Sequence, residues 1–379
     1  MERGGAATGP RWIHASVLVL LWAGQGHGQS VNGTVREVLP YPDFFIIGAM
    51  KCGTTTLHHL LTENPRICAE GEKEKHFFDK VTYITKHEDS REQYLAEFSD
   101  CGKQQLTIDS SPDYISTIAV PERMAQSYGP EALSRKRFIL ILRDPTLRHY
   151  SEYQMRLRVC ETSYNNDVAS KMIKSKSKSK DKEKDADDDE EYRIERFTRN
   201  CRAIAHNFVP GMPSSDLQFM TFFQYIHSTH GKQELLRGHY MQHLRAWLKF
   251  VRRDQMYIVN FATLLQNTTR VYDDILAFVG VRAGVSEHPI ALPEPSYKGR
   301  AHAYDPFSYL DCASRERLNT YFAKVNPGLE DFINKGSGAR SPFEPDFAPF
   351  GTSSCSAGPG KNDADDFMVG TEEDYAEGD

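Results

Sequence analysis

The sequence lacks several patterns that would assign it to a common class. It has no Cys-x-x-Cys pair, so the usual spacing of a zinc site is absent, and no internal repeat is evident. It also lacks a carboxylate set suited to the Mg²⁺ of a kinase. The formal net charge is −6 over 379 residues, so the whole molecule is not a general nucleic-acid binder. We therefore expect neither a metal nor a nucleic-acid partner, in a chain of ordinary globular composition.

The N-terminus has a short apolar run rather than a full membrane span. Residues 12–23 are apolar, two arginines precede them, and small residues follow. Because a bilayer span needs about 20 apolar residues, the run is typical of a signal peptide. We expect residues 1–28 to be a signal peptide cleaved near Gly28. A short uncleaved signal anchor is the alternative, and it is the only basis on which we expect membrane attachment.

Two further features indicate that the protein enters the secretory pathway, where we expect it in the Golgi lumen or secreted. Asn32 and Asn267 begin Asn-x-Thr sequons, which are glycosylated only in that pathway. The seven cysteines suit an oxidising compartment, and their odd number leaves at least one thiol. Cys160 and Cys201 flank a low-complexity insertion, and we hypothesise that they form a disulfide at its base.

The most informative stretch is residues 42–61, PDFFIIGAMKCGTTTLHHLL. An apolar strand, residues 44–47, leads through a glycine turn into an amphipathic helix. Such a turn is an anion cradle, because backbone N–H groups converge there and the helix dipole favours negative charge. Gly48 and Gly53 permit the tight turn, and Lys51 adds a positive charge.

This loop is a poor match to that of an ATPase or kinase. A Walker A loop, G-x-x-x-x-G-K-[ST], has its lysine directly after the second glycine. Here Lys51 comes two residues before Gly53, and Thr54 takes the place of the lysine. The loop is shaped for phosphate, although an ordinary strand-to-helix turn can carry the same glycine pattern.

A second segment, residues 138–153, has a similar arrangement. An apolar strand ends before Arg143, at the carboxyl end where open α/β sheets bind ligands. Asp144 can cap a helix that begins at Pro145. Ser151 lies about two helical turns after Arg143, so this pair suits a second phosphate.

A third segment, residues 297–302, has two cations around a glycine. In order, the patterns K-x-G-T, R-D-P-x-x-R-x-x-S and K-G-R-x-H resemble those of sulfotransferases that use 3′-phosphoadenosine 5′-phosphosulfate (PAPS). The similarity is greatest to the Golgi branch that modifies heparan sulfate and related glycosaminoglycans. The resemblance implies a P-loop-like α/β fold with a central parallel sheet flanked by helices.

The resemblance also implies a PAPS site. The first motif would hold the 5′-phosphosulfate, the second motif the 3′-phosphate, and the third would close over the cofactor. The residues so implied are Lys51, Cys52, Gly53, Thr54, Thr55, Thr56, Arg143, Ser151, Lys298, Gly299 and Arg300.

The catalytic base is expected in residues 70–80, EGEKEKHFFDK, where the family pattern E-x-[HQ]-F-F begins at Glu74. Sulfuryl transfer resembles phosphoryl transfer, so it needs a base for the acceptor proton and a cation for the spreading charge. Glu74 and Lys51 fill these roles, although a solvated charge run is the alternative for Glu74. His76 orients Glu74, touches the acceptor or belongs to the core, and Asp79 is expected to contact the substrate.

One segment departs from the glucosamine 3-O-sulfating relatives. Residues 107–114 read TIDSSPDY, and Ser110 stands where those relatives have a lysine near the acceptor. The role of that lysine is absent or supplied elsewhere, so the acceptor stays open. Asp109 and Asp113 are candidates to contact the acceptor, or Asp109 caps the turn at Pro112.

We therefore expect a sulfotransferase domain at residues 41–335, interrupted at about 165–195, and an acidic disordered tail at 336–379. The insertion is first lysine-rich and then acidic, so it cannot bury a core. It is either a solvated loop or a patch that attracts a polyanionic glycan.

The expected function is transfer of a sulfuryl group from PAPS to a glycan hydroxyl or amine, with a glycosaminoglycan or other polysaccharide as the acceptor. One alternative is a non-glycan acceptor, such as a tyrosyl protein or a small alcohol. The other is a nucleotide-binding or glycan-binding protein without turnover.

Overall fold

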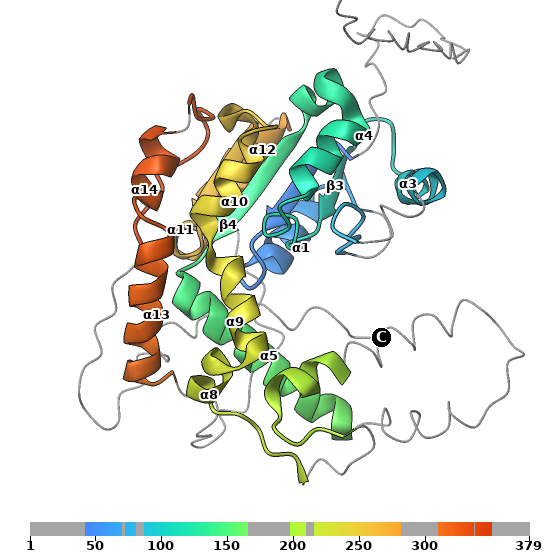
Figure 1. Ribbon diagram of the computed structural model, residues 1–379. Coiled ribbons are helices and arrows are strands. Elements are labelled where there is room, and N and C mark those ends of the chain that lie inside the picture. The colour runs from blue at the N-terminus through green and yellow to red at the C-terminus, as the bar shows by residue number, and fades with distance from the viewer. Residues whose placement is uncertain are drawn as a thin grey trace, which may run out of the picture. The chain divides into compact units, whose positions relative to one another are not determined.

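Five parallel strands form one sheet in the described part of the chain, in the order β2-β3-β1-β4-β5 (Figure 1). The structure is a computed structural model that describes residues 42–69, 73–80, 87–165, 198–209, 216–281, 310–336 and 338–350. The strands are β1 (Phe44–Gly48), β2 (Ile67–Cys68), β3 (Leu106–Ser110), β4 (Arg137–Leu142) and β5 (Met256–Asn260). This architecture confirms the predicted α/β class.

Helices connect and flank the strands. The first group is α1 (Thr54–Thr62), α3 (His87–Ala96), α4 (Val120–Arg135), α5 (Pro145–Asn165), α8 (Phe222–His227), α9 (Thr229–Leu235), η2 (Leu236–Gly238) and α10 (Tyr240–Trp247). The second group is η3 (Arg253–Gln255), α11 (Phe261–Gln266), α12 (Thr268–Val279), α13 (Cys312–Val325), α14 (Leu329–Asp331) and η4 (Phe332–Gly336). No described helix has both the length and the apolar character that a membrane crossing requires.

The two predicted strands are the central ones. β1 is buried at every residue, and β4 at every residue after Arg137, as expected for strands covered on both faces. Phe45 pairs with Phe138 across the two strands, and their rings stack with centroids 5.4 Å apart. The chain continues from β1 to β2 and β3 on one side of the sheet, and β4 and β5 lie on the other. Both phosphate motifs therefore begin where the strand order reverses, the usual ligand position in such sheets.

A second hydrophobic cluster lies outside the sheet core. It joins α5, α8 and α13 through Tyr153, Phe222, Tyr225, Leu318 and Phe322, among others. The disulfide between Cys160 and Cys201, the pair expected at the base of the insertion, fixes the C-terminal half of α5 to residues beyond that insertion. α5 is thereby anchored at the end distant from the sheet.

The remaining cysteines are also accounted for in part. Cys68 and Cys101 form a second disulfide, and Cys312 is also disulfide-bonded. Cys52 keeps its thiol and is buried. The expected signal peptide, Asn32, most of the insertion and the motif at Lys298, Gly299 and Arg300 lie outside the described residues.

The expected boundary of the acidic tail is wrong. Residues 338–350 pack on the domain, where Phe347 is part of the core. The buried Glu344 carboxylate accepts hydrogen bonds from both terminal nitrogens of Arg253, one of them at 2.7 Å. The prediction averaged composition over the whole stretch to residue 379, and this average concealed a short segment with its own apolar and charged anchors.

Candidate active site

The loop after β1 has the geometry of an anion cradle. Gly48 must be glycine, because a Cβ there would lie 2.4 Å from a side-chain carbon of Ile115 and 2.8 Å from the carbonyl oxygen of Pro112. Gly53 has a left-handed φ of 90° and precedes α1, and no side chain among the described residues caps this helix. The first-turn N–H groups of α1 therefore point to the loop as donors for an anion.

The side chains of the loop differ in their exposure to that cradle. Lys51 is nearly buried within the turn, with a left-handed φ of 70°. Cys52 is fully buried, and its N–H donates to the carbonyl oxygen of Ala49 at 3.1 Å. The backbone of Cys52 therefore stabilises the turn, and its side chain is not exposed to solvent. Thr54 and Thr56 are buried as well, whereas Thr55 is partly exposed.

The second motif meets the first. Arg143, directly after β4, donates from Nη1 to the carbonyl oxygen of Lys51 at 3.3 Å, and its guanidinium lies over the Phe261 ring. The Tyr240 hydroxyl donates to the Arg143 carbonyl oxygen at 2.9 Å. The Asp144 carboxylate accepts from the Leu147 N–H at 2.9 Å, which is the predicted cap of α5. Ser151 follows on α5 and is buried.

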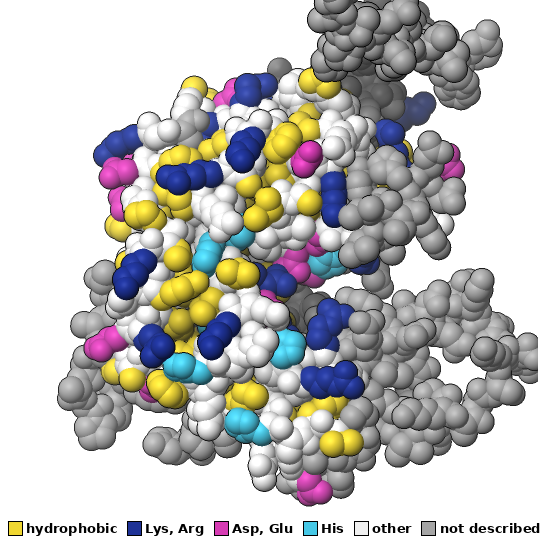
Figure 2. Space-filling view, viewed as in Figure 1, with side chains coloured by type: hydrophobic (Ala, Val, Ile, Leu, Met, Phe, Trp, Pro, Cys, Tyr) yellow, Lys and Arg dark blue, Asp and Glu magenta, His cyan; other side chains and the backbone are white. Residues whose placement is uncertain are grey.

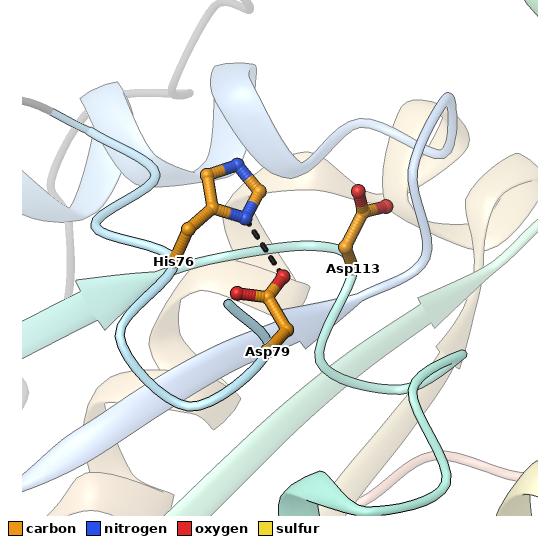
Figure 3. A group of neighbouring side chains, drawn as sticks. All are labelled: His76, Asp79 and Asp113. Carbon is orange, nitrogen blue, oxygen red and sulfur yellow. Dashed lines mark hydrogen bonds and ion pairs between the residues drawn. The ribbon is translucent and has the colours of Figure 1, made fainter. Parts of the chain in front are cut away.

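Glu74 lies at the centre of a charged cluster. Lys73 Nζ is 2.8 Å from Glu74 Oε1, and His76 Nε2 is 3.4 Å from Glu74 Oε2. His76 Nδ1 lies 2.8 Å from Asp79 Oδ2 (Figure 3). The Glu74 side chain is 38% exposed, whereas that of Asp79 is 8% exposed. Glu74 is therefore partly open to solvent and Asp79 is nearly buried, and the expected contact of Asp79 with the substrate stays a prediction.

The cluster changes the protonation of both partners. Burial raises the pKa of the Glu74 carboxyl, but the hydrogen bond from His76 and the charge of Lys73 outweigh it, so the net pKa is lower than usual. Burial lowers the pKa of His76, but its bonds to Asp79 and Glu74 dominate and raise the pKa from 6.5 to about 10. At neutral pH the site thus contains an ionised Glu74 beside a positively charged imidazole.

The segment with Glu74 is fixed to the end of β3 by hydrogen bonds. Glu74 N–H donates to the Ser110 carbonyl oxygen at 3.1 Å, and His76 N–H donates to Ser111 Oγ at 3.1 Å. The Tyr114 hydroxyl accepts from the Phe77 N–H at 3.0 Å. These bonds fix the backbone of Glu74 and His76, in addition to the contacts of their side chains.

Asp109 supports this arrangement from below. Its buried carboxylate accepts from the hydroxyls of Tyr94 at 2.8 Å, Ser111 at 2.7 Å and Tyr114 at 2.9 Å. Burial raises the pKa of the Asp109 carboxyl, against the effect of these hydrogen bonds. The suggestions that Asp109 contacts the acceptor or caps the turn at Pro112 are wrong, because both its oxygens serve the interior.

Backbone conformation marks the same residues. Among the described non-glycine residues, positive φ angles occur at Lys51 (70°), Glu74 (65°) and His76 (52°). Such conformations are strained for residues with a Cβ and are concentrated at functional sites. These are the three residues expected from the sequence to be catalytic.

His76, Asp79 and Asp113 each place one possible metal-ligand atom within 4.8 Å of the others. Both nitrogens of His76 face carboxylates, however, and Asp113 forms an ion pair with Arg237. In this structure the three side chains therefore take part in an ion-pair network. Figure 2 shows acidic, basic and histidine side chains meeting in a hollow near the middle of the face drawn.

The network extends from Asp113 to α5. Arg237 Nε lies 2.6 Å from the Glu234 carboxylate, and Glu234 lies 2.9 Å from Arg156. Arg156 in turn lies 2.9 Å from Glu152, which follows Ser151 on α5. Fixed charges thus join Asp113 to α5, the helix that carries Ser151.

Comparison with known proteins identifies the family. Residues 41–292 match the family model described as "Sulfotransferase domain", which is more than half of the chain. The chain belongs to this sulfotransferase family.

Individual relatives of this sulfotransferase match at modest identity. It is 34% identical over 112 residues to heparan sulfate glucosamine 3-O-sulfotransferase 5 of Mus musculus, covering 30% of each chain. It is 24% identical over 315 residues to bifunctional heparan sulfate N-deacetylase/N-sulfotransferase 3 of Homo sapiens, covering 78% of this chain and 30% of that one. The matches span about a quarter to a third of the length of such relatives. A sulfotransferase structure from Alicyclobacillus acidocaldarius matches with a TM-score of 0.46 at 20% identity, covering 77% of this chain and 96% of that chain.

Sequence reasoning missed several residues of this site. Lys73 was part of an apparent charge run, and Asp109 was expected to contact the acceptor or to cap a turn rather than to bond to Tyr114 in the interior. Arg237 lies more than 100 residues after the segment it contacts, since its partner Asp113 is 124 residues away. The family pattern E-x-[HQ]-F-F located Glu74 and His76 in advance, whereas no pattern in the sequence indicated Lys73 or Arg237.

Proposed function

We propose that this protein transfers a sulfuryl group from PAPS to a hydroxyl or amine of a glycan, with a glycosaminoglycan as the acceptor. One observation carries the proposal: an accessible carboxylate, Glu74, is tied through Lys73 to Thr55 in the first turn of α1, where the anion cradle lies. A base next to a phosphate-shaped loop is the arrangement that sulfuryl transfer requires.

The residues present fit PAPS as the donor. The uncapped N-terminus of α1 and the nearly buried cation of Lys51 suit the 5′-phosphosulfate. Arg143 and Ser151, after β4 and on α5, suit the 3′-phosphate, and their burial favours strong charge-assisted bonds. PAPS would supply an activated sulfuryl group on a phosphate leaving group.

The side chains then have distinct tasks. Glu74 takes the proton of the acceptor hydroxyl while the acceptor oxygen forms a bond to sulfur. The bond between sulfur and the 5′-phosphate oxygen breaks in the same step. Lys51 stabilises the charge that develops on that phosphate, which leaves as adenosine 3′,5′-bisphosphate. Charged His76, held by Asp79, keeps the Glu74 carboxylate oriented.

The acceptor and the compartment follow from separate arguments. The names of two relatives specify heparan sulfate, and the disulfides suit the oxidising secretory pathway. Ser110 is buried and bonded to His58 at 2.7 Å, so it does not replace the lysine of the 3-O-sulfating relatives. We therefore propose a glycosaminoglycan acceptor without assigning the sugar position.

The test is transfer of labelled sulfate from PAPS to desulfated heparan, chondroitin and dermatan chains, with a tyrosyl peptide as comparison. We expect labelling of at least one glycan by the wild type and loss of labelling in Glu74→Gln. Labelling of the peptide alone would favour the non-glycan alternative. Binding of the nucleotide without transfer to any acceptor would favour a protein without turnover.

A further inference from the structure

Two lysines flank Glu74, and they point to different parts of the molecule. Lys75 forms an ion pair with Glu97 and lies over the Phe98 ring at 5.0 Å, so it attaches the segment to the scaffold. Lys73 instead donates from Nζ to Thr55 Oγ1 at 2.7 Å and to Glu74 Oε1 at 2.8 Å. Only Lys73 of this pair joins Glu74 to the cradle.

The ammonium group of Lys73 lies between two acceptors, the Thr55 hydroxyl and the Glu74 carboxylate. Its side chain is 15% exposed, so much of its charge is shielded from bulk water. The charge reaches α1, where it contributes to lowering the pKa of His58 and of His59, in each case after burial. A lysine ammonium has three N–H donors, and these two contacts use two of them.

We propose that Lys73 is a second catalytic cation: it holds Glu74 in position and gives its third N–H to the sulfuryl or phosphate oxygens bound at the N-terminus of α1. This inference rests on the proposed function, since it assigns a contact to the donor. It explains why Thr55 is the threonine of the first turn that remains partly exposed and bonded to a cation.

The chemistry gives Lys73 a task separate from that of Lys51. Lys51 lies in the loop and is expected at the leaving phosphate. Lys73 touches the base, so its charge lies on the side from which the acceptor oxygen approaches. As that oxygen bonds to sulfur, negative charge spreads over the equatorial oxygens, and a cation at this point stabilises it. No further reactant is needed, because the proton still passes from the acceptor to Glu74.

The test compares Lys73→Gln and Lys73→Arg with the wild type, and uses Lys335→Met as a charge control. Lys335 pairs with Asp331 on an exposed surface, so its removal changes net charge without touching the site. We expect Lys73→Gln to lower kcat about 100-fold, as loss of one transition-state donor does, with the glycan KM within about threefold of wild type. Its affinity for PAPS in the absence of acceptor, measured by calorimetry, should fall about tenfold.

Lys73→Arg keeps the charge and should recover at least about tenfold of the lost kcat, whereas Lys335→Met should equal the wild type. A kcat of Lys73→Gln within about threefold of wild type, or an unchanged affinity for PAPS, would overturn the proposal. The binding measurement decides the role of Lys73 even if the wild type sulfates no acceptor. Failure of the proposed function is thereby distinguished from failure of this inference.

Discussion

Arg143 Nη1 donates to the carbonyl oxygen of Lys51 at 3.3 Å, although the two residues are 92 positions apart. This bond joins the loop that follows β1 to the loop that follows β4, at the point where the strand order of the sheet reverses. Because both side chains are nearly buried, the two cations create a confined region of positive charge. Such a region suits a nucleotide with phosphate groups at both ends of its ribose.

Replacement of Arg143 by alanine should weaken binding of adenosine 3′,5′-bisphosphate by about 10- to 100-fold, the effect of losing a charge-assisted hydrogen bond. Replacement by lysine should retain only part of the affinity, because an ammonium cannot form the fork of a guanidinium. Calorimetric titration measures both, and the melting temperature of each variant controls for folding. An affinity of Arg143→Ala equal to that of the wild type would remove Arg143 from the nucleotide site.

The Glu74→Gln variant tests the base. Glutamine retains the size and a carbonyl oxygen for Lys73, but it cannot take a proton, so kcat should fall about 10²- to 10⁴-fold. Affinity for the bisphosphate should stay within about threefold of wild type, since the neutral amide removes no donor from the cradle. Steady-state sulfate transfer and calorimetry give the two values. A nearly normal kcat would show that another group accepts the proton.

The sequence was sufficient for the scaffold of the site. Runs of buried apolar residues predicted β1 and β4, the glycines predicted the turn at Gly53, and Asp144 proved to cap α5. These features are local, because strand burial, positive φ and helix capping each depend on a few adjacent residues.

Contacts between distant segments were not predictable in the same way. Lys73 contacts Thr55 across 18 positions, and the backbone has positive φ at Glu74 and His76; residue spacing carries no signal of either feature. Asp109 looked like a surface carboxylate at a turn, and only its three buried hydroxyl partners reveal its role as an internal support.

The Tyr114→Phe variant tests that support. It removes the hydroxyl that accepts from the Phe77 N–H and donates to Asp109, which should lower the free energy of unfolding by about 1–3 kcal/mol. The matched control is Tyr257→Phe, because the buried hydroxyl of Tyr257 has no hydrogen-bond partner in the described part of the chain. Urea denaturation compares the two. Equal stability of the two variants would contradict a structural role for the Tyr114 hydroxyl.

The raised pKa of His76 predicts a pH-dependent stability. A base whose pKa is higher in the folded than in the unfolded chain stabilises the fold fully below its unfolded value, and the effect is lost as pH rises through its folded value. For His76 the window runs from 6.5 to about 10. The melting temperature of the wild type should therefore exceed that of His76→Gln most at pH 6, and the difference should shrink toward pH 10. A difference that is constant over this range would mean that folding does not raise the pKa of His76.

The most direct test of the central claim is calorimetric binding of adenosine 3′,5′-bisphosphate to the whole chain, with adenosine 5′-monophosphate and the Lys51→Met variant as comparisons. We predict saturable binding of the bisphosphate to the wild type, weaker binding of the monophosphate because it lacks the 3′-phosphate, and weaker binding to the variant because the cradle has lost its cation. The absence of heat with the bisphosphate, or equal affinity for both nucleotides, would contradict the account.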